Sequence, residues 1–203
     1  MAAIDAAERR YWLTVGAFAG VLDRAIRWPD VRITFDDGNL SDVTMALPQL
    51  LKRQLGGRFF ILAARVGTAG YLGRGELREL LGAGMEIGSH GMHHRAWRRL
   101  RGDDLRQEIQ VAKASLEDML GIPITQAACP FGEYDRAALQ MLAQAGFTRV
   151  YTSDRGLARS NAWLQARNTV TAATNLADLE QVRTWPRTRQ WAQGLKIAVK
   201  RWR

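Results

Sequence analysis

The sequence predicts an α/β fold, in the form of a small, incomplete or distorted (β/α) barrel of about six to seven parallel strands. β-prone runs alternate with helical segments of about 10–18 residues, a pattern typical of parallel strands joined by right-handed crossovers. Polar residues that could bind a metal follow several of these runs, and (β/α) barrels build their active sites at the carboxyl ends of their strands. No glycine-rich phosphate-binding motif follows the first run, which argues against a nucleotide-binding sheet.

Six runs have the apolar, β-branched composition of strands. The first ends at an Asp-Asp-Gly turn that begins at Asp36. The third ends directly before His90, and the fifth directly before Asp154. The predicted strands cover residues 31–35, 59–64, 85–89, 124–129, 149–153 and 164–170.

Helical segments separate the strands, and capping residues and glycines set their ends. Ser41 is expected to N-cap the second helix, which Gly56 and Gly57 end. The longest helix shows a clear apolar periodicity that includes Leu105 and Ile109. The predicted helices cover residues 15–26, 41–55, 76–81, 103–120 and 135–145.

The composition is that of one globular domain. The chain has 203 residues, of which 47% are hydrophobic and 24% charged, enough to bury a sizeable core. Cys129 is the only cysteine, so no intrachain disulfide forms and a reducing cytosol is expected. The apolar segment at residues 11–22 is interrupted by Gly16 and Gly20 and is interpreted as a helix rather than a signal sequence.

All three histidines lie within five positions. His90 and His94 are four residues apart, so one turn can direct both imidazoles to the same point. A third ligand would have to be a carboxylate, and Asp36 and Asp37 both supply one. Two histidines and one aspartate leave coordination positions open, as in a catalytic metal site. There are also simpler interpretations. The two histidines could lie on a solvated helix face, and the Asp-Asp-Gly segment could be an ordinary turn.

Three segments together resemble the polysaccharide deacetylases, the NodB-homology group or carbohydrate esterase family four. They have the order and spacing of the family's first three motifs. The segments are Thr34-Phe35-Asp36-Asp37-Gly38, Ser89-His90-Gly91-Met92-His93-His94 and Ala128-Cys129-Pro130-Phe131-Gly132.

The resemblance implies a role for each motif. Asp37, His90 and His94 would hold one divalent metal, expected to be Zn²⁺, with Co²⁺, Ni²⁺ and Mn²⁺ as alternatives. Asp36 would be the general base that activates water. The backbone N–H of Phe131 would stabilise the oxyanion.

Two departures from the family pattern affect this assignment. Ala128 replaces the arginine that orients the base in many members, and Arg167 is the candidate substitute. No histidine follows His94, so the family's C-terminal acid is absent, and Asp154 is the candidate for a role as acid or as partner of an arginine.

Other residues were assigned to substrate binding or to the core. Pro130 and Gly132 would line the substrate site beside Phe131. Trp97 and Trp163 would wall a sugar pocket or, alternatively, belong to the core. Cys129 is expected to be a small buried residue.

The last residues of the chain form a basic amphipathic helix in this interpretation. Beyond Glu180 there are seven basic residues and no acidic one, so subtracting seven from the net charge of +9 leaves +2. The basic residues are Arg183, Arg187, Arg189, Lys196, Lys200, Arg201 and Arg203, and the apolar face holds Trp191, Leu195, Ala198, Val199 and Trp202. We therefore divide the chain into a barrel at 1–180 and a helix at 181–203. The helix is expected either to bind an anionic membrane without taking part in the chemistry, or to dock on the barrel with its charges in water.

The implied function is removal of an N-acetyl or other N-acyl group from an amino sugar. A nucleotide- or lipid-linked precursor of cell-surface polysaccharide is expected as substrate, in the cytoplasm or at the inner face of the membrane, with no nucleic acid and no obligate protein partner. The missing histidine favours, as an alternative, a catalytically impaired metal-binding pseudoenzyme or a sugar-binding module. Two histidines and a carboxylate would also suit a non-haem Fe(II) oxygenase.

Overall fold

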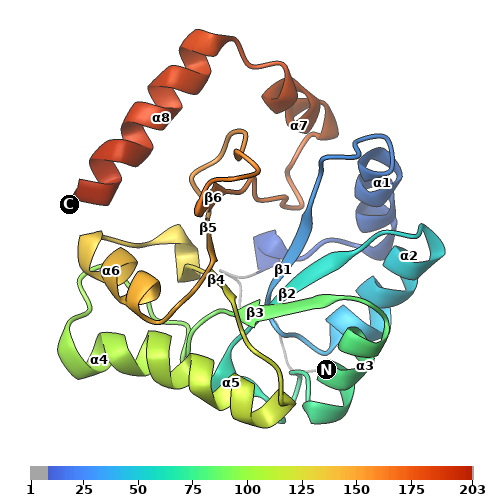
Figure 1. The fold of residues 1–203 in the computed structure, drawn as a ribbon. Helices are drawn as coiled ribbons and strands as arrows, with labels where there is room; N and C mark the ends of the chain where they lie inside the picture. The colour runs from blue at the N-terminus through green and yellow to red at the C-terminus, as the bar shows by residue number, and fades with distance from the viewer. Residues whose placement is uncertain (1–8, 203) are drawn as a thin grey trace.

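The computed structural model describes residues 9–202, and the helices surround one curled sheet (Figure 1). Six strands pair in chain order, β1-β2-β3-β4-β5-β6, and every pair is parallel. They are β1 (Ile33–Asp37), β2 (Gly57–Ile61), β3 (Glu86–Ser89), β4 (Gln126–Ala128), β5 (Arg149–Thr152) and β6 (Leu164–Ala166). Because each strand lies beside its predecessor and β1 and β6 form the two edges, the sheet is a half-barrel. The predicted incomplete (β/α) barrel is confirmed.

The first strand begins two residues later than predicted. The amide of Val31 donates to the carbonyl oxygen of Trp28 at 3.0 Å, so a turn occupies the predicted start of the strand. As a result β1 contains Asp36 and Asp37 instead of ending before them. The two aspartates are therefore the last two residues of β1.

Helices cover the outer face of the sheet, and several begin at a side-chain cap. Thr14 caps α1 (Val15–Ala25) and Asp135 caps α6 (Arg136–Gln144). The remaining helices on this face are α2 (Leu47–Lys52), α3 (Arg74–Gly82), α4 (Gly102–Arg106) and α5 (Ala112–Leu120). The C-terminal part adds α7 (Leu176–Arg183) and α8 (Arg187–Trp202). Within residues 9–202 no helix combines the length and hydropathy needed to cross a membrane.

Two predicted helices differ from the observed ones. Ser41 makes no capping hydrogen bond and has helical backbone angles itself, so the expectation that it is the N-cap was wrong. A π-helical turn, η2 (Asp42–Ala46), leads into α2 instead. A second π-helical turn, η4 (Gln107–Val111), joins α4 to α5 where one regular helix was predicted. Such turns insert an extra residue and re-aim the side chains around them.

The core lies between the helices and one face of the sheet. Alternate strand residues, such as Phe59 and Ile61, face this core and the helix side chains that fill it. Phe60, Ala128 and Tyr151 face the opposite, concave side and form a small apolar cluster of their own. The concave side therefore has an apolar floor, and the carboxyl ends of the strands form its rim.

Candidate active site

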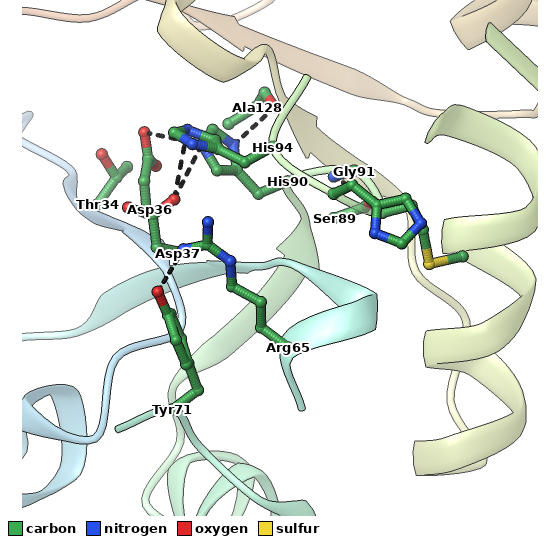
Figure 2. Close-up of polar contacts among 12 residues, drawn as sticks. Thr34, Asp36, Asp37, Arg65, Tyr71, Ser89, His90, Gly91, His94 and Ala128 are labelled. Atoms are coloured by element: carbon green, nitrogen blue, oxygen red, sulfur yellow. Dashed lines mark hydrogen bonds and ion pairs between the residues drawn. The ribbon is translucent and has the colours of Figure 1, made fainter. Parts of the chain in front are cut away.

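The first two motifs meet at the carboxyl ends of β1 and β3 (Figure 2). Asp37 Oδ1 lies 3.6 Å from His90 Nε2 and 3.5 Å from His94 Nε2. One ligand atom from each of these three residues lies within 4.8 Å of the others. Asp37 has a left-handed backbone with φ of 78°, which aspartate tolerates better than most residues and which turns the chain away from the sheet. The structure thus brings together the three residues expected to bind a metal.

His90 is oriented as a metal ligand would be. Its Nδ1 lies 2.9 Å from the carbonyl oxygen of Ala128, which requires the proton on Nδ1 and leaves the Nε2 lone pair facing Asp37. Burial lowers the pKa of His90, so the imidazole is neutral near pH 7. Two neutral imidazole nitrogens and a carboxylate suit a divalent transition metal with open positions. The donor set therefore fits the metal that the sequence implies.

A buried carboxylate that the sequence reasoning missed holds the loop between the two histidines. Glu108, which is fully buried on η4, accepts the backbone N–H of Met92 at 3.1 Å and that of His93 at 3.1 Å. A Cβ on Gly91 would lie 2.7 Å from Glu108 Oε2, so this carboxylate occupies the space that a side chain at position 91 would need. The available signal was an acidic residue on the apolar face of the predicted helix, beside Ile109.

Asp36 and Arg167 form a bidentate ion pair. Arg167 Nη1 donates to Asp36 Oδ1 at 2.6 Å and Nη2 donates to Oδ2 at 2.8 Å, and Nη1 also donates to Thr34 Oγ1 at 3.0 Å. Burial alone would raise the pKa of Asp36, but the charge and hydrogen bonds of Arg167, together with His90 and His94, outweigh burial and lower this pKa to about 2. The carboxylate is therefore ionised and held in one orientation.

The position of Arg167 explains how Ala128 is accommodated. Ala128 is fully buried against Phe60 and Tyr151 on the concave side. Arg167 directly follows β6, and its guanidinium lies 5.4 Å from the centre of the Phe60 ring, so it reaches the same apolar floor. Arg167 is thus placed to orient Asp36 from a different strand.

The third motif forms a tight turn above His94. Phe131 has a φ of 57° and is 64% exposed, and its ring centre lies 4.3 Å from that of His94. The amides of Gly132 and Glu133 donate to carbonyl oxygens within the turn. The amide of Phe131 therefore stays the candidate oxyanion donor. Pro130 and Gly132 are both buried, so they shape the turn rather than offer exposed surface to a ligand.

Asp154 lies beside this turn, because Lys200 Nζ contacts both its carboxylate and the carbonyl oxygen of Gly132. Its Oδ2 accepts from the hydroxyl of Tyr134 at 2.7 Å, and its Oδ1 accepts from Lys200 Nζ at 2.6 Å. The expected partner was an arginine, and the observed partner is a lysine from α8. Lys200 was not singled out by the sequence reasoning, because its position on the helix said nothing about what it contacts.

The two tryptophans do not line a sugar pocket, and that expectation is corrected. Trp97 is 1% exposed and packs in the main core, so no ring face is accessible. Trp163 precedes β6, where its carbonyl accepts from Val150, and its indole donates to the carbonyl oxygen of Phe147 at 2.7 Å. These contacts place it at the amino end of the sheet, opposite the site. Cys129 is fully buried, and burial raises the pKa of its thiol.

The comparisons with known proteins decide the family. The family model described as polysaccharide deacetylase matches residues 27–150, which is more than half of the chain. The chain belongs to the polysaccharide deacetylase family. The matched segment includes all three motifs and ends at β5, before Arg167 and Lys200.

Individual relatives agree with this assignment. The chain is 24% identical over 147 residues to YxkH of Bacillus subtilis, which bears the name of a polysaccharide deacetylase. The match covers 72% of this chain, which spans about half (53%) of that relative's length. IcaB from Ammonifex degensii is 25% identical with a TM-score of 0.72, over 87% of this chain and 90% of that one. The Streptococcus pyogenes deacetylase PplD, solved with acetate, is 21% identical with a TM-score of 0.69, over 80% and 76%.

Proposed function

We propose that this polysaccharide deacetylase is a metal-dependent hydrolase that removes an N-acetyl or other N-acyl group from an amino sugar. The observation that carries the proposal is the paired arrangement of the two aspartates. Asp37 faces two histidines, whereas the neighbouring Asp36 is fixed by Arg167. One carboxylate is thus suited to bind a metal and the other to accept a proton.

Asp37, His90 and His94 would hold one divalent metal, with Zn²⁺ as the first candidate and Co²⁺, Ni²⁺ and Mn²⁺ as alternatives. Such an ion supplies a Lewis acid and lowers the pKa of water to about 7. His90 contributes through Nε2 because Ala128 fixes its Nδ1 proton. Glu108 holds the backbone between the two histidines and so fixes their separation.

Asp36 would act as the general base and then return the proton. Its pKa of about 2 keeps it ionised at neutral pH, and the Arg167 fork points both oxygens in a fixed direction. Once it has taken the proton from water, Asp36 would pass this proton to the departing amine. This assigns Asp36 the step that the missing C-terminal histidine performs in the family. The Phe131 amide would donate to the oxyanion, with Pro130 and Gly132 shaping its turn.

The substrate that we propose is a nucleotide- or lipid-linked acetamido sugar. The acetate bound to the Streptococcus pyogenes relative is the acid that N-deacetylation releases, which supports an acetyl group. An amphipathic α8 is compatible with a substrate carried on a membrane lipid. Because the chain spans about half of YxkH, the activity of the whole relative is not transferred to it directly.

An acetate-release assay tests the function. Purified protein is incubated with nucleotide-linked, lipid-linked and oligomeric acetamido sugars, with and without added Zn²⁺, and Asp36→Asn serves as the control. We expect Zn²⁺-dependent acetate release from a linked precursor. Metal binding without release from any substrate would indicate the alternative, a catalytically impaired pseudoenzyme or sugar-binding module.

We propose, in addition, that the outer face of α8 binds an anionic membrane at the cytoplasmic side. Trp191, Leu195 and Trp202 are 83%, 65% and 76% exposed and lie on one side of the helix, with basic residues flanking them. Tryptophans and lysines in this arrangement suit the membrane interface. Arg203, the last basic residue of the predicted helix, lies outside the described residues.

A further inference from the structure

Lys200 connects α8 to the turn that carries Phe131. Its Nζ donates to the carbonyl oxygen of Gly132 at 2.7 Å and to Asp154 Oδ1 at 2.6 Å, and it lies 4.3 Å from the centre of the Tyr134 ring. The side chain of Lys200 is only 28% exposed and that of Asp154 only 10%. A charged pair this well buried and this fully hydrogen-bonded has a fixed geometry.

The turn that Lys200 contacts has an uncommon backbone. Phe131 and Gly132 have φ values of 57° and 67°, so two successive residues are left-handed. A bulky residue such as Phe131 stays in this region only where its surroundings hold it there. Ser153 limits the turn on one side, because a Cβ on Gly132 would lie 2.8 Å from the Ser153 Cβ. Lys200 holds the turn as well, through its hydrogen bond to the carbonyl oxygen of Gly132.

The docking of α8 uses its polar face. Gln193 donates to the backbone oxygen of Asp154, seven residues before Lys200 donates to the Asp154 carboxylate. Residues seven apart lie on the same side of an α-helix. Both side chains therefore reach the end of β5, while Trp191 and Leu195 on the opposite side stay exposed.

We propose that Lys200 is a positioning residue, which holds the Phe131–Gly132 turn in its left-handed form and so aims the Phe131 amide into the active site. This inference rests on the proposed function, since it assigns that amide to the oxyanion. It gives one face of α8, which carries Gln193 and Lys200, a role in holding the turn.

The test compares two lysines of the same helix. Lys200→Met removes the charge and both hydrogen bonds, whereas Lys196→Met removes an equal charge from an exposed position. Lys200→Arg keeps the charge and the donors. The measurements are kcat and KM for acetate release, bound Zn²⁺, and hydrogen exchange of the Gly132 and Glu133 amides, both of which bond inside the turn.

We expect Lys200→Met to lower kcat by about 10- to 100-fold, as misplacing a catalytic group by about 1 Å does, with KM and Zn²⁺ content unchanged. Exchange of the two turn amides should accelerate by at least about tenfold, and Lys200→Arg should restore most of both values. Lys196→Met should match wild type. If Lys200→Met is too unstable to purify, Lys200→Gln replaces it under the same criteria.

The outcomes separate this inference from the proposed function. Wild-type protein that releases no acetate would refute the function, but the exchange comparison would still decide whether Lys200 holds the turn. Equal exchange in Lys200→Met and Lys196→Met would overturn the inference, whatever happens to kcat. Loss of bound Zn²⁺ in Lys200→Met would also overturn it, because Lys200 would then act through the metal site.

Discussion

Asp36 and Asp37 are neighbours in the chain and both lie near His90 Nε2, at 3.8 Å and 3.6 Å, but their other partners differ. Asp36 meets the guanidinium of Arg167, which reaches the concave side from β6. Asp37 meets His90 and His94.

Asparagine substitutions should therefore separate catalysis from metal binding. Asp36→Asn should lower turnover by about 10²- to 10⁴-fold, the range typical of losing a general base, while bound Zn²⁺ stays near one per chain. Asp37→Asn should lose the metal as well. Elemental analysis and acetate release measure the two properties on the same samples. If Asp36→Asn lost its metal and Asp37→Asn kept it, the assignments would be reversed.

The Arg167 fork should control both the orientation and the pKa of Asp36. In Arg167→Met the carboxyl group stays buried but loses its main positive neighbour, so the pKa of Asp36 should rise from about 2. We expect kcat to fall by about 10- to 100-fold and the acidic limb of the kcat/KM profile, measured at saturating Zn²⁺, to move to higher pH. Arg159→Met, an exposed position in the preceding loop, is the control. An unshifted acidic limb would contradict the pairing.

At the scale of elements, the π-helical turn η4 determines how the histidine loop is held. The inserted residue directs Glu108 into the core, where its carboxylate accepts two backbone N–H groups of the loop. A carboxylate is a stronger acceptor for these donors than an amide is. Through Glu108, η4 thereby holds the loop that follows β3.

Replacing this carboxylate should weaken metal binding without removing a ligand. Glu108→Gln should lower the affinity for Zn²⁺ by about 10- to 100-fold, the usual range for groups that orient metal ligands. Competition with a chelator measures the affinity directly. Glu79→Gln, at an exposed position on α3, should bind as wild type does. Equal affinities in the two variants would exclude this role for Glu108.

The cap of α6 should make stability depend on pH. Asp135 is 2% exposed and accepts the backbone N–H groups of Ala138 and Arg99, both at 3.0 Å. Burial tends to raise the pKa of Asp135, but these hydrogen bonds and Arg101 outweigh it and hold the pKa below 3.8. The stabilisation is therefore complete above pH 3.8 and is lost as pH falls through the lower, folded-state pKa.

Asp135→Ala should accordingly cost about 1–2 kcal/mol of unfolding free energy at pH 6.5. Urea denaturation of wild type and variant at pH 6.5 and at pH 3 measures the difference. The gap should narrow at pH 3, because this pH lies below 3.8 and the contribution of the charge to stability is then no longer complete. A gap of equal size at both values would show that the charge of Asp135 is not what stabilises the cap.

For the whole molecule, local patterns predicted the strands and most helices, because alternation and helical periodicity are properties of neighbouring residues. The proximity of Asp37, His90 and His94 was predictable for a similar reason, since each motif is a short segment at a strand end. What could not be predicted from local patterns depends on distant contacts. The local sequence around Trp97 did not indicate its burial. The contacts of Glu108 with Met92 and of Lys200 with Gly132 join segments that are distant in the sequence.

The tail should bind vesicles through its outer face only. Wild type should sediment with vesicles that contain anionic lipid, less so at high salt, since each lysine or arginine near such a surface contributes about 1 kcal/mol. The double variant Trp191→Ser and Leu195→Ser should lose binding but keep activity on a soluble acetamido sugar. Leu157→Ser, which removes an exposed leucine elsewhere, is the control. Equal sedimentation of all three proteins would refute membrane docking through this face.

The ion pair between Asp36 and Arg167 joins residues 131 positions apart and links the two edge strands of the half-barrel. During synthesis the base leaves the ribosome long before its partner does. A nascent chain that ends at β5 already carries Asp37, His90 and His94 and the three segments that resemble the family's motifs. Asp36, however, still lacks the cation that orients it. The residues proposed to bind the metal are thus synthesised before the arginine that orients the proposed base, and activity should report completion of the last strand.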